Sequence, residues 1–254
     1  MTSQYANQEP KKPAKADYGL DAPGVVHNLA MAGALATVAG FVLNALLAGP
    51  APLIGQILLG VGLLNGVSEL GAAGLMIRSS RIGKLKMRDE LIDGLKLKGD
   101  ERVLDAGCGR GLLLIGAAKR LTSGKATGLD IWQEVDQSGN SPDATLGNAA
   151  AEGVSGKVEI RSGDMRLMRF EDQTFDVIVS SMAIHNIYDK AEREKALEEI
   201  VRVLKPGGRL AVIDFANTDE YAAYWKAHGI PNAQLSGARW VMFPPVRVVT
   251  GIKS

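Results

Sequence analysis

The feature that most constrains the fold of this chain is a run of 47 residues, 22–68, that contains no Asp, Glu, Lys or Arg. Within this run and just beyond it lie two apolar segments, Val25–Ala48 and Pro52–Ile77, of 24 and 26 residues. The sequence GPAP separates them, and proline and glycine interrupt helices. About 20 residues cross the roughly 30 Å hydrocarbon core of a bilayer, so both segments are long enough to do so. The sequence therefore predicts a two-helix transmembrane hairpin over residues 24–77.

Two details bear on whether this hairpin lies in lipid or is buried in a soluble protein. In both segments small residues recur four positions apart, as close helix packing in lipid favours: Ala36 with Gly40, and Gly62 with Gly66. Glu69 favours the soluble alternative, because a carboxylate at the centre of a span costs about 2.5–3.5 kcal/mol. It lies toward the Ile77 end, however, so a span that ends near Ser68 and continues as an interfacial helix accommodates it. We favour the membrane hairpin.

Basic residues flank the hairpin. Residues 78–88, RSSRIGKLKMR, carry five basic side chains and no acid, and Lys11, Lys12 and Lys15 precede the first segment. The turn between the segments is uncharged. Because excess Lys and Arg stays on the cytoplasmic side, both ends of the chain are expected in the cytosol, with the turn outside. The basic cluster also suits anionic headgroups, which makes residues 24–88 the expected contact with membrane lipids. Alternatively, it is only a solvated helix face.

The remaining composition limits the class of protein. Residues 1–23 are polar and rich in Lys, Pro, Ala and Gln, which predicts a flexible arm without a secretory signal. The 29 basic and 28 acidic side chains leave a net charge of +1, which gives no electrostatic case for nucleic acid. Cys108 is the only cysteine, so no intrachain disulfide is expected. No metal is expected either, because the histidines lie far apart in sequence, at His27, His185 and His228.

From about Arg88 the sequence alternates between apolar runs typical of strands and helical periodicity. Strands are predicted over five ranges: 102–106, 126–131, 157–161, 175–180 and 208–214. Helices are predicted over five others: 87–96, 111–120, 142–152, 190–204 and 218–228. Two late runs, RWVMF and VRVVTGI, are expected to pair as an antiparallel edge around Pro244–Pro245. This order predicts an α/β fold with a doubly wound, mostly parallel seven-stranded sheet, and such sheets bind ligands at the carboxyl ends of their strands.

A glycine loop follows the first of these strands, within VLDAGCGRGLLLIGAAKR, residues Val103–Arg120. A dinucleotide fingerprint, G-x-G-x-x-G, would place its third glycine at position 112, which is Leu112 here. Asp105, two residues before the first glycine, opposes the positive potential that a pyrophosphate needs. A cationic ligand reverses this preference. S-adenosylmethionine carries an ammonium and a sulfonium group, and Asp105 would attract its amino-acid moiety directly or through water.

The order of motifs over residues 87–254 resembles that of class I S-adenosylmethionine-dependent methyltransferases of the small-molecule, "methyltransferase 11"-like type. VLDAGCGRG resembles the first motif, ATGLDIW the second and SGDM the third. FDVIVSSMAIHNI resembles the fourth strand and its exit loop, and ALEEIVRVLKPGGRLAVIDF resembles the following helix, turn and fifth strand. The resemblance implies a Rossmann-like methyltransferase domain over residues 99–254 with S-adenosyl-L-methionine as cofactor. Residues 78–98 would then form a basic linker and capping helix.

The resemblance also implies roles for individual residues. Asp130, 19 residues after Gly111, would accept both ribose hydroxyls, and Asp164 would accept from the adenine amino group with Met165 close to the ring. The expected cofactor-binding residues are Asp105, Gly107, Cys108, Gly109, Gly111, Asp130, Ile131, Asp164, Met165 and Ser180. Alternatively, Asp130 and Asp164 only cap strand ends. Cys108 is interpreted as filling a slot for a small residue.

One departure from the family pattern follows Asp130. The family usually enters a helix quickly, but here WQEVDQSGNSPDATL intervenes. Ser141 and Pro142 resemble a helix N-cap and first helical residue, so the helix is delayed. Residues 132–140 are therefore expected to form an extra loop near the ribose and adenine, either a lid or recognition loop, or one without a function.

Methyl transfer from a sulfonium is an in-line displacement, so alignment and exclusion of water are the main tasks of the protein. A general base is needed only if the acceptor arrives protonated. His185, just past the fourth predicted strand, is the candidate base; the alternative is a loop histidine bonded by its neighbours or contacting the cofactor. Candidate substrate contacts are Asn186, Tyr188, Asp214 and Tyr18. Tyr18 and the segment RSSRIGK are expected to fold over the pocket.

The hairpin suggests a lipophilic acceptor such as a quinone, an isoprenoid or another lipid, methylated by a membrane-anchored enzyme whose catalytic domain is cytosolic. Alternatively, the hairpin only localises an enzyme that methylates a small soluble thiol or amine. Two other classes stay open: a catalytically silent cofactor-binding membrane scaffold, and an NAD(P)-dependent oxidoreductase. The position of the third glycine and Asp105 argue against the oxidoreductase.

Overall fold

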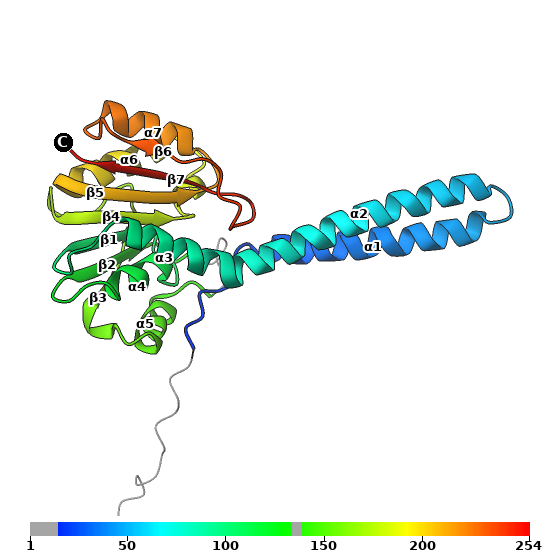
Figure 1. Cartoon of the computed structure of the whole chain (residues 1–254), viewed down its shortest axis with the longest axis horizontal. Coiled ribbons are helices and arrows are strands. Elements are labelled where there is room, and N and C mark those ends of the chain that lie inside the picture. Colours follow the sequence, from blue (N-terminus) through cyan, green and yellow to red (C-terminus); the bar gives the residue numbers. More distant parts are fainter. Residues whose placement is uncertain (1–14, 134–138) are drawn as a thin grey trace, which may run out of the picture.

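The computed structural model describes residues 15–133 and 139–254 and consists of a long helical hairpin attached to an α/β domain (Figure 1). The two helices of the hairpin are α1 (Pro23–Leu47) and α2 (Pro52–Arg78). The turn falls at GPAP, as predicted. Expectations for Lys11, Lys12 and most of the arm over residues 1–23, and for the centre of the loop over 132–140, lie outside the described residues.

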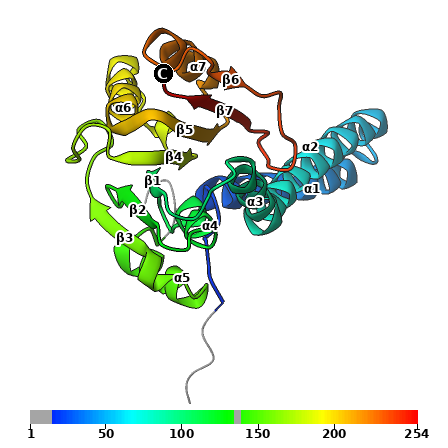
Figure 2. The same ribbon diagram turned by 60° about the vertical axis from the view of Figure 1, so that its left-hand side comes forward.

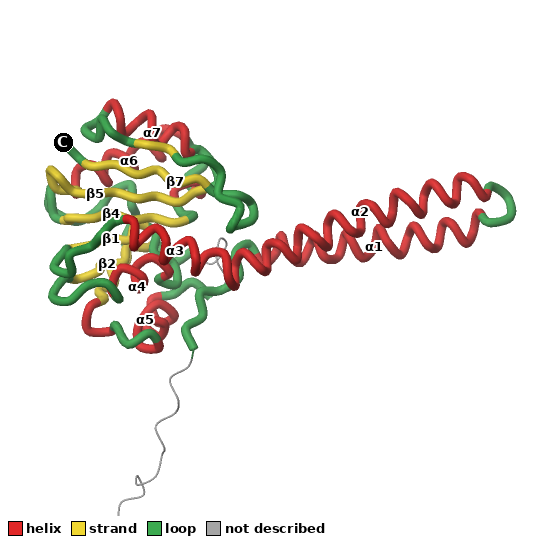
Figure 3. The backbone as a smooth tube through the Cα atoms, in the orientation of Figure 1, coloured by secondary structure: helices red, strands yellow, loops and turns green. Residues whose placement is uncertain are grey.

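The two helices pack through the small residues that the sequence spaces four apart. A Cβ atom placed at Gly62 would lie 2.6 Å from the carbonyl oxygen of Ala36 and 2.9 Å from the Cα of Gly40, so only glycine permits this approach. Large apolar side chains cover the outer faces and are exposed, among them Leu35, Leu46, Leu53, Leu64 and Val67. The hairpin projects away from the α/β domain, and both helices are long and apolar enough to cross a membrane (Figures 1 and 3).

Helix α2 continues into the α/β domain without a break. A π-helical segment, Ser79–Gly83, joins it to α3 (Lys84–Gly94). The small residues of this segment allow two other parts of the chain to approach: Ser80 Oγ accepts a hydrogen bond from the backbone N–H of Asp21, and Gly83 lies against the carbonyl of Val241. A continuous helix, Pro52–Gly94, therefore joins the hairpin to the domain (Figure 2).

The sheet has seven strands in the order β3-β2-β1-β4-β5-β7-β6. Their bounds are β1 Arg102–Ala106, β2 Lys125–Asp130, β3 Val158–Ser162, β4 Phe175–Ser181, β5 Leu204–Asp214, β6 Gln234–Leu235 and β7 Arg247–Ile252. All neighbours are parallel except β7, which is antiparallel to both β5 and β6. This confirms the predicted doubly wound, mostly parallel seven-stranded sheet. The strand order reverses between β1 and β4, which is where such sheets bind ligands.

Helices cover both faces of the sheet. Besides α3 they are α4 (Leu112–Ala118), α5 (Pro142–Ala151), α6 (Lys190–Val203) and α7 (Thr218–Ala227), with short 3₁₀ segments at Ser155–Lys157 and Ile184–Asn186. One buried cluster joins α3, α4 and α5 to the sheet, through residues such as Met87, Leu91, Leu113 and Ala149. A second joins α6 and α7 to its other face, through Leu197, Tyr221 and Trp225. The delayed start of α5 is confirmed, because Ser141 Oγ accepts from the N–H of Ala144 at 3.2 Å.

The predicted antiparallel pairing of RWVMF with VRVVTGI is wrong. Strand β7 pairs instead with β5 and with the two-residue strand β6, and a single bridge, Arg239 to Val246, joins the two late runs. RWVMF forms no strand; its Phe243 packs against the base of the hairpin, beside Val26, Ala73 and Met76. Tertiary contact outweighs the strand propensity of these residues.

Candidate active site

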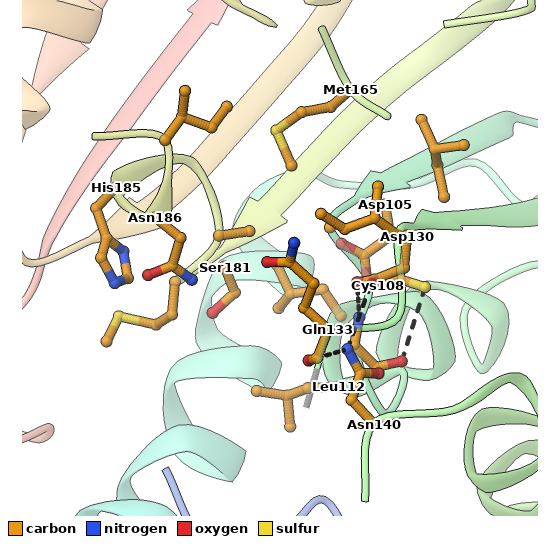
Figure 4. Close-up of a pocket in the computed structure, with 18 of the residues that line it drawn as sticks. Asp105, Cys108, Leu112, Asp130, Gln133, Asn140, Met165, Ser181, His185 and Asn186 are labelled. Carbon is orange, nitrogen blue, oxygen red and sulfur yellow. Dashed lines mark hydrogen bonds between the residues drawn. The ribbon is translucent and has the colours of Figure 1, made fainter. Parts of the chain in front are cut away.

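A pocket of about 690 Å³ lies at the carboxyl ends of the central strands. It is lined by twelve of the expected site residues: Tyr18, Asp105, Gly107, Cys108, Gly109, Asp130, Ile131, Asp164, Met165, His185, Asn186 and Tyr188. Figure 4 places His185 and Asn186 on one side and Asp105, Cys108 and Asp130 on the other. Within the described ranges, no group of three His, Cys, Asp or Glu side chains is arranged to hold a metal ion.

The glycine bend between β1 and α4 needs glycine at all three positions. Gly107, Gly109 and Gly111 have φ angles of 75°, 50° and 85°, in the left-handed region that side chains disfavour. The N–H groups of Gly107 and Cys108 donate to the carbonyl of Leu129 at 2.8 and 3.1 Å, which ties the bend to the end of β2. Gly107 and Gly109 line the pocket, whereas Gly111 caps α4 and lies outside the lining.

Asp105 presents an unpaired carboxylate oxygen at this bend. The residue is 1% exposed, and its Oδ2 accepts from the N–H of Leu114 at 2.7 Å, while Oδ1 is buried without a partner. Burial, assisted by the charge of Asp130, raises the pKa of Asp105 to about 7. An unpaired buried acceptor costs free energy until a donor meets it. This oxygen fits the ammonium group of S-adenosylmethionine and would repel a diphosphate.

Asp130 at the end of β2 connects the glycine bend to the extra loop. Its Oδ2 accepts from the N–H of Gly109 at 2.8 Å, and its Oδ1 accepts from the N–H of Trp132 at 2.7 Å and from Nδ2 of Asn140 at 3.2 Å. The carboxylate lines the pocket while it holds two loops in place. The expectation that it receives ribose hydroxyls is compatible with this position and stays a prediction.

Asn140 is a pocket residue that the sequence did not single out. Its Nδ2 donates to Asp130 and also to the carbonyl of Gln133 at 3.2 Å, so two acceptors fix the orientation of the amide. The amide oxygen is therefore turned away from both and is buried without a partner. The only sequence signal that could have identified Asn140 as a pocket residue is its position at the end of the extra loop.

Asp164 lies at the pocket with its carboxylate already engaged. Arg166 donates to it from Nε at 2.9 and 3.0 Å, and from a terminal nitrogen at 2.5 Å. Hydrogen bonding from Arg166 keeps the pKa of Asp164 below its usual range. Arg166 also pairs with Glu192 of α6 at 3.0 Å. An adenine amino group would therefore share Asp164 with a guanidinium, which the sequence did not predict.

His185 lines the pocket, and Asp214 lies behind it, out of the lining. Nδ1 of His185 lies 2.7 Å from Oδ1 of Asp214, at an angle outside hydrogen-bond geometry, and the backbone N–H of His185 donates to Oδ2 at 3.3 Å. Asp214 is fully buried and also accepts from the N–H of Phe215 and the hydroxyl of Tyr221. Nε2 of His185 is the nitrogen left for a ligand proton.

Two expected site residues lie behind the pocket surface instead of lining it. Asp214 was expected to contact substrate, but it has no exposed surface and orients His185. Ser180 is fully buried in β4 and donates to the carbonyl of Ala106 at 2.7 Å, and its neighbour Ser181 lines the pocket. Alternation along a strand places adjacent side chains on opposite faces, which explains the one-residue difference.

The N-terminal segment 16–22 crosses the pocket as a strap. Tyr18, Asp21 and Ala22 line the pocket, and the Tyr18 hydroxyl donates to Glu152 at 3.1 Å. Burial raises the pKa of that hydroxyl. As expected, part of RSSRIGK also reaches the pocket: Lys84 donates from Nζ to the carbonyls of Tyr18 and Gly19 and to Oδ1 of Asp21, at 2.8, 2.7 and 3.0 Å.

Lys84 therefore belongs to the pocket, as expected for RSSRIGK, and not to the lipid-facing basic cluster that residues 78–88 were also expected to form. It is 3% exposed, and burial lowers its pKa while Asp21 opposes that shift. Arg88 is also buried and pairs with Asp89 at 2.9 Å. The exposed cations of the expected cluster are Arg78, Arg81 and Lys86.

Comparison with known proteins identifies the family of this chain. The profile of a family described as "Methyltransferase domain" matches residues 97–240. Sterol 4-C-methyltransferase strm-1 of Caenorhabditis elegans is 33% identical over 138 residues, which cover 54% of this chain and 38% of that protein. The ubiquinone/menaquinone biosynthesis C-methyltransferase UbiE of Ruegeria sp. (strain TM1040) is 33% identical over 129 residues, covering 51% and 48%. The matched part thus spans about half the length of these relatives or less.

A solved structure shows a related fold. A SAM-dependent methyltransferase from Aquifex aeolicus superposes with a TM-score of 0.52 at 20% sequence identity, covering 67% of this chain and 92% of that one. At this identity the similarity concerns the fold of the α/β domain.

Proposed function

Because the chain belongs to the class I S-adenosylmethionine-dependent methyltransferases, we propose that it transfers a methyl group to a small lipophilic acceptor while anchored in a membrane by its hairpin. The observation that carries this proposal is the composition of one pocket. The pocket holds the unpaired oxygen of Asp105. Its wall also includes Ala22 and Lys84, which adjoin the hairpin. Two relatives are named for a sterol and for ubiquinone and menaquinone biosynthesis, which supports a lipophilic acceptor.

The residues that would hold the cofactor follow the edge of the sheet. Asp105 would accept from the ammonium group, Asp130 from the ribose hydroxyls, and Met165 and Ile131 would lie against the adenine ring. Asp164 would accept from the adenine amino group beside Arg166. When bound, S-adenosylmethionine supplies a methyl group activated by its positively charged sulfur. The glycine bend lets the backbone approach a ligand closely, and the strap over residues 16–22 shields the pocket from water.

His185 would act on the acceptor side. Asp214 holds Nδ1, so Nε2 receives the proton when the acceptor carries one. Asn186 and the exposed Tyr188 would contact the acceptor. An acceptor that arrives without an acidic proton needs only orientation by these side chains.

The exposure of the hairpin supports its place in lipid. In the most apolar windows of α1 and of the continuous helix Pro52–Gly94, only 11% and 17% of the residues are buried, whereas a hairpin in a soluble core would be covered. With a rise of 1.5 Å per residue, α1 and α2 are about 37 and 40 Å long, enough for a bilayer core of about 30 Å. Glu69, which weighed against a span, is half-buried and faces Gly33 of α1, which reduces its exposure to lipid.

A labelling experiment on the full chain tests the proposal. The protein is reconstituted in vesicles with a membrane lipid extract and S-adenosylmethionine labelled in its methyl group, and the products are separated between organic and aqueous phases. We expect label in a lipid product, and less of it with Asp130→Ala at the same cofactor concentration. Label found only in water-soluble products would contradict the lipophilic acceptor. Cofactor binding without any labelled product would favour the silent scaffold.

The orientation of the hairpin has a separate test. A cysteine at Ala51, in the turn, is expected to react with an impermeant thiol reagent on intact cells. Labelling only after lysis would contradict a cytosolic catalytic domain.

A further inference from the structure

We propose that the run Arg239–Phe243, here called the docking loop, is a membrane-docking surface that seats the catalytic domain on anionic lipid. Three exposed cations at the base of the hairpin complete this surface: Arg78, Arg81 and Lys86. The inference rests on the proposed function, since it requires the hairpin to lie in a bilayer. It adds a second contact with the membrane, made by a segment that follows the basic residues at the base of the hairpin by more than 150 positions in the sequence.

The docking loop is fixed to the base of the hairpin. The N–H of Phe243 donates to Ser79 Oγ at 2.9 Å, and its side chain packs against Val26, Ala73 and Met76 of the two helices. The missing side chain of Gly83 allows the carbonyl of Val241 to approach the π-helical segment. Figures 1 and 2 both show the connection between β6 and β7 reaching the place where α2 runs into α3. If α1 and α2 cross a bilayer, this loop is therefore held close to its surface.

The side chains of the docking loop divide between two environments. Met242 is 4% exposed and lines the pocket, whereas Trp240 is 72% exposed. Tryptophan favours the membrane–water interface because one end of its side chain is apolar and the other is polar. Ile82, 47% exposed on the adjoining π-helical segment, extends the apolar surface.

Charge selects anionic lipid as the partner. Lys84 and Arg88 are buried and paired with Asp21 and Asp89, so they do not contribute to the surface. The exposed cations precede and follow Ile82 on the same continuous helix. Basic residues next to a span attract anionic headgroups. Exposed cations beside an exposed indole and an exposed isoleucine match a headgroup region above acyl chains.

The docking loop also contributes to both the lipid-facing surface and the pocket. Within the loop, Met242 lines the pocket, Trp240 faces outward, and Phe243 packs against the hairpin. Ala22, at the start of the hairpin, also lines the pocket. A lipophilic acceptor would thus reach the pocket beside this loop from the bilayer surface.

Fluorescence quenching in vesicles tests the inference, because the only native cysteine, Cys108, is buried and leaves single introduced cysteines free for labelling. An apolar aromatic, environment-sensitive fluorophore is attached at Trp240→Cys, where it takes the place of the indole. The same fluorophore is attached at Leu64→Cys on the outer face of α2, and at Asp100→Cys just before β1, at the amino ends of the strands. The chain without an added cysteine gives the background. Vesicles contain anionic phospholipid and lipid brominated either near the headgroup or deep in the acyl chain.

We expect headgroup-proximal bromine to quench the label at position 240 at least twofold more than the label at position 100, and deep bromine to quench the label at position 64. If position 64 is quenched and position 240 matches position 100, the docking surface is wrong while the membrane anchor stands. If neither 64 nor 240 is quenched, the hairpin is not in lipid and the proposed anchoring fails as well.

The charge requirement has its own measurement. Exchanging anionic for zwitterionic phospholipid, or combining Arg78→Gln, Arg81→Gln and Lys86→Gln, is expected to reduce quenching at position 240 at least twofold, with position 64 unchanged. Equal quenching at position 240 would overturn the role of the three cations. Trp240→Ala should leave the affinity for S-adenosylmethionine unchanged in detergent, and Trp240→Tyr should retain docking. A changed cofactor affinity would instead assign Trp240 to the fold of the pocket.

Discussion

Replacing Asp105 by Asn is expected to weaken cofactor binding and, at the same time, to stabilise the cofactor-free protein above pH 7. The geometry makes this substitution specific. Oδ2 of Asp105 accepts from the N–H of Leu114 at 2.7 Å, and the amide oxygen of Asn can keep that hydrogen bond. Oδ1 is buried without a partner, and in Asn an NH₂ group takes its place. The substitution thus removes the half of the carboxylate that would meet an ammonium group and preserves the half that supports the fold.

The expected loss in binding follows from one charged hydrogen bond. Such a bond contributes about 1.5–3 kcal/mol, which corresponds to roughly a 10- to 150-fold increase in Kd at 1.4 kcal/mol per factor of ten. Isothermal titration of S-adenosylmethionine into the full chain in detergent measures this change. Asp176→Asn is the matched control. Asp176 also accepts a hydrogen bond from a backbone N–H, that of Arg102 at 2.8 Å, but it lies near the amino end of β4, at the far end of the strands from the pocket.

The effect on stability has the opposite sign. Burial raises the pKa of Asp105 to about 7, so the folded state without cofactor favours the protonated carboxyl. The contribution of this group to stability is fully present below its unfolded pKa of about 4 and is lost as the pH rises through about 7. Asn has no proton to lose. Thermal unfolding at pH 5 to 8 should therefore show a smaller decline with pH for Asp105→Asn than for the parent chain.

The two results together discriminate between a binding residue and a structural one. A variant with a lowered unfolding temperature at every pH and an unchanged Kd would assign Asp105 to the fold alone. That outcome would refute the reasoning from the unpaired oxygen.

Three further predictions concern other parts of the molecule. Asp130→Ala should weaken S-adenosylmethionine binding at least tenfold, because charged acceptors for two hydroxyls are lost; unchanged affinity in equilibrium dialysis would assign Asp130 to the support of its loops. His185→Ala should lower kcat by roughly 10²-fold or more with little change in cofactor Kd, and Asp214→Asn should lower kcat less and shift its pH profile; equal turnover in both variants would remove the pair from the mechanism. Gly62→Leu should disrupt the hairpin, because a Cβ there meets the facing helix at 2.6 Å, whereas Gly60→Leu points into open space; matching amide hydrogen exchange in the two variants would contradict the packing.

The central strands were predictable because their signals are local. The strand expected over 102–106 is β1 without a shift, and those expected near 126–131 and 157–161 differ by one residue at each end. The end of the sheet was not predictable in the same way. RWVMF has strong strand propensity, yet Phe243 packs against helices that are distant in sequence. Strand β6 has only two residues, too few to give a periodic signal.

Some features of the site could be predicted from the sequence and others could not. That Asp105 and Asp130 share a pocket follows from parallel strands, because their carboxyl ends meet at one edge of the sheet. The orientation of individual side chains does not follow from such patterns. Lys84 turns inward to carbonyls of the strap more than 60 residues away, and the amide nitrogen of Asn140 is held by Asp130 and Gln133, which leaves its oxygen buried without a partner. These contacts join segments whose proximity no spacing reveals.

The central claim is that the glycine bend and Asp105 seat a cationic sulfur nucleotide, and the structure of the full chain in nanodiscs with S-adenosylmethionine bound tests it most directly. The account predicts the ligand in the pocket between β1 and β4, with its ammonium nitrogen within hydrogen-bond distance of Oδ1 of Asp105 and its methyl group directed toward the side of His185. A ligand bound elsewhere, or a bend that instead surrounds the phosphates of a dinucleotide, would contradict it.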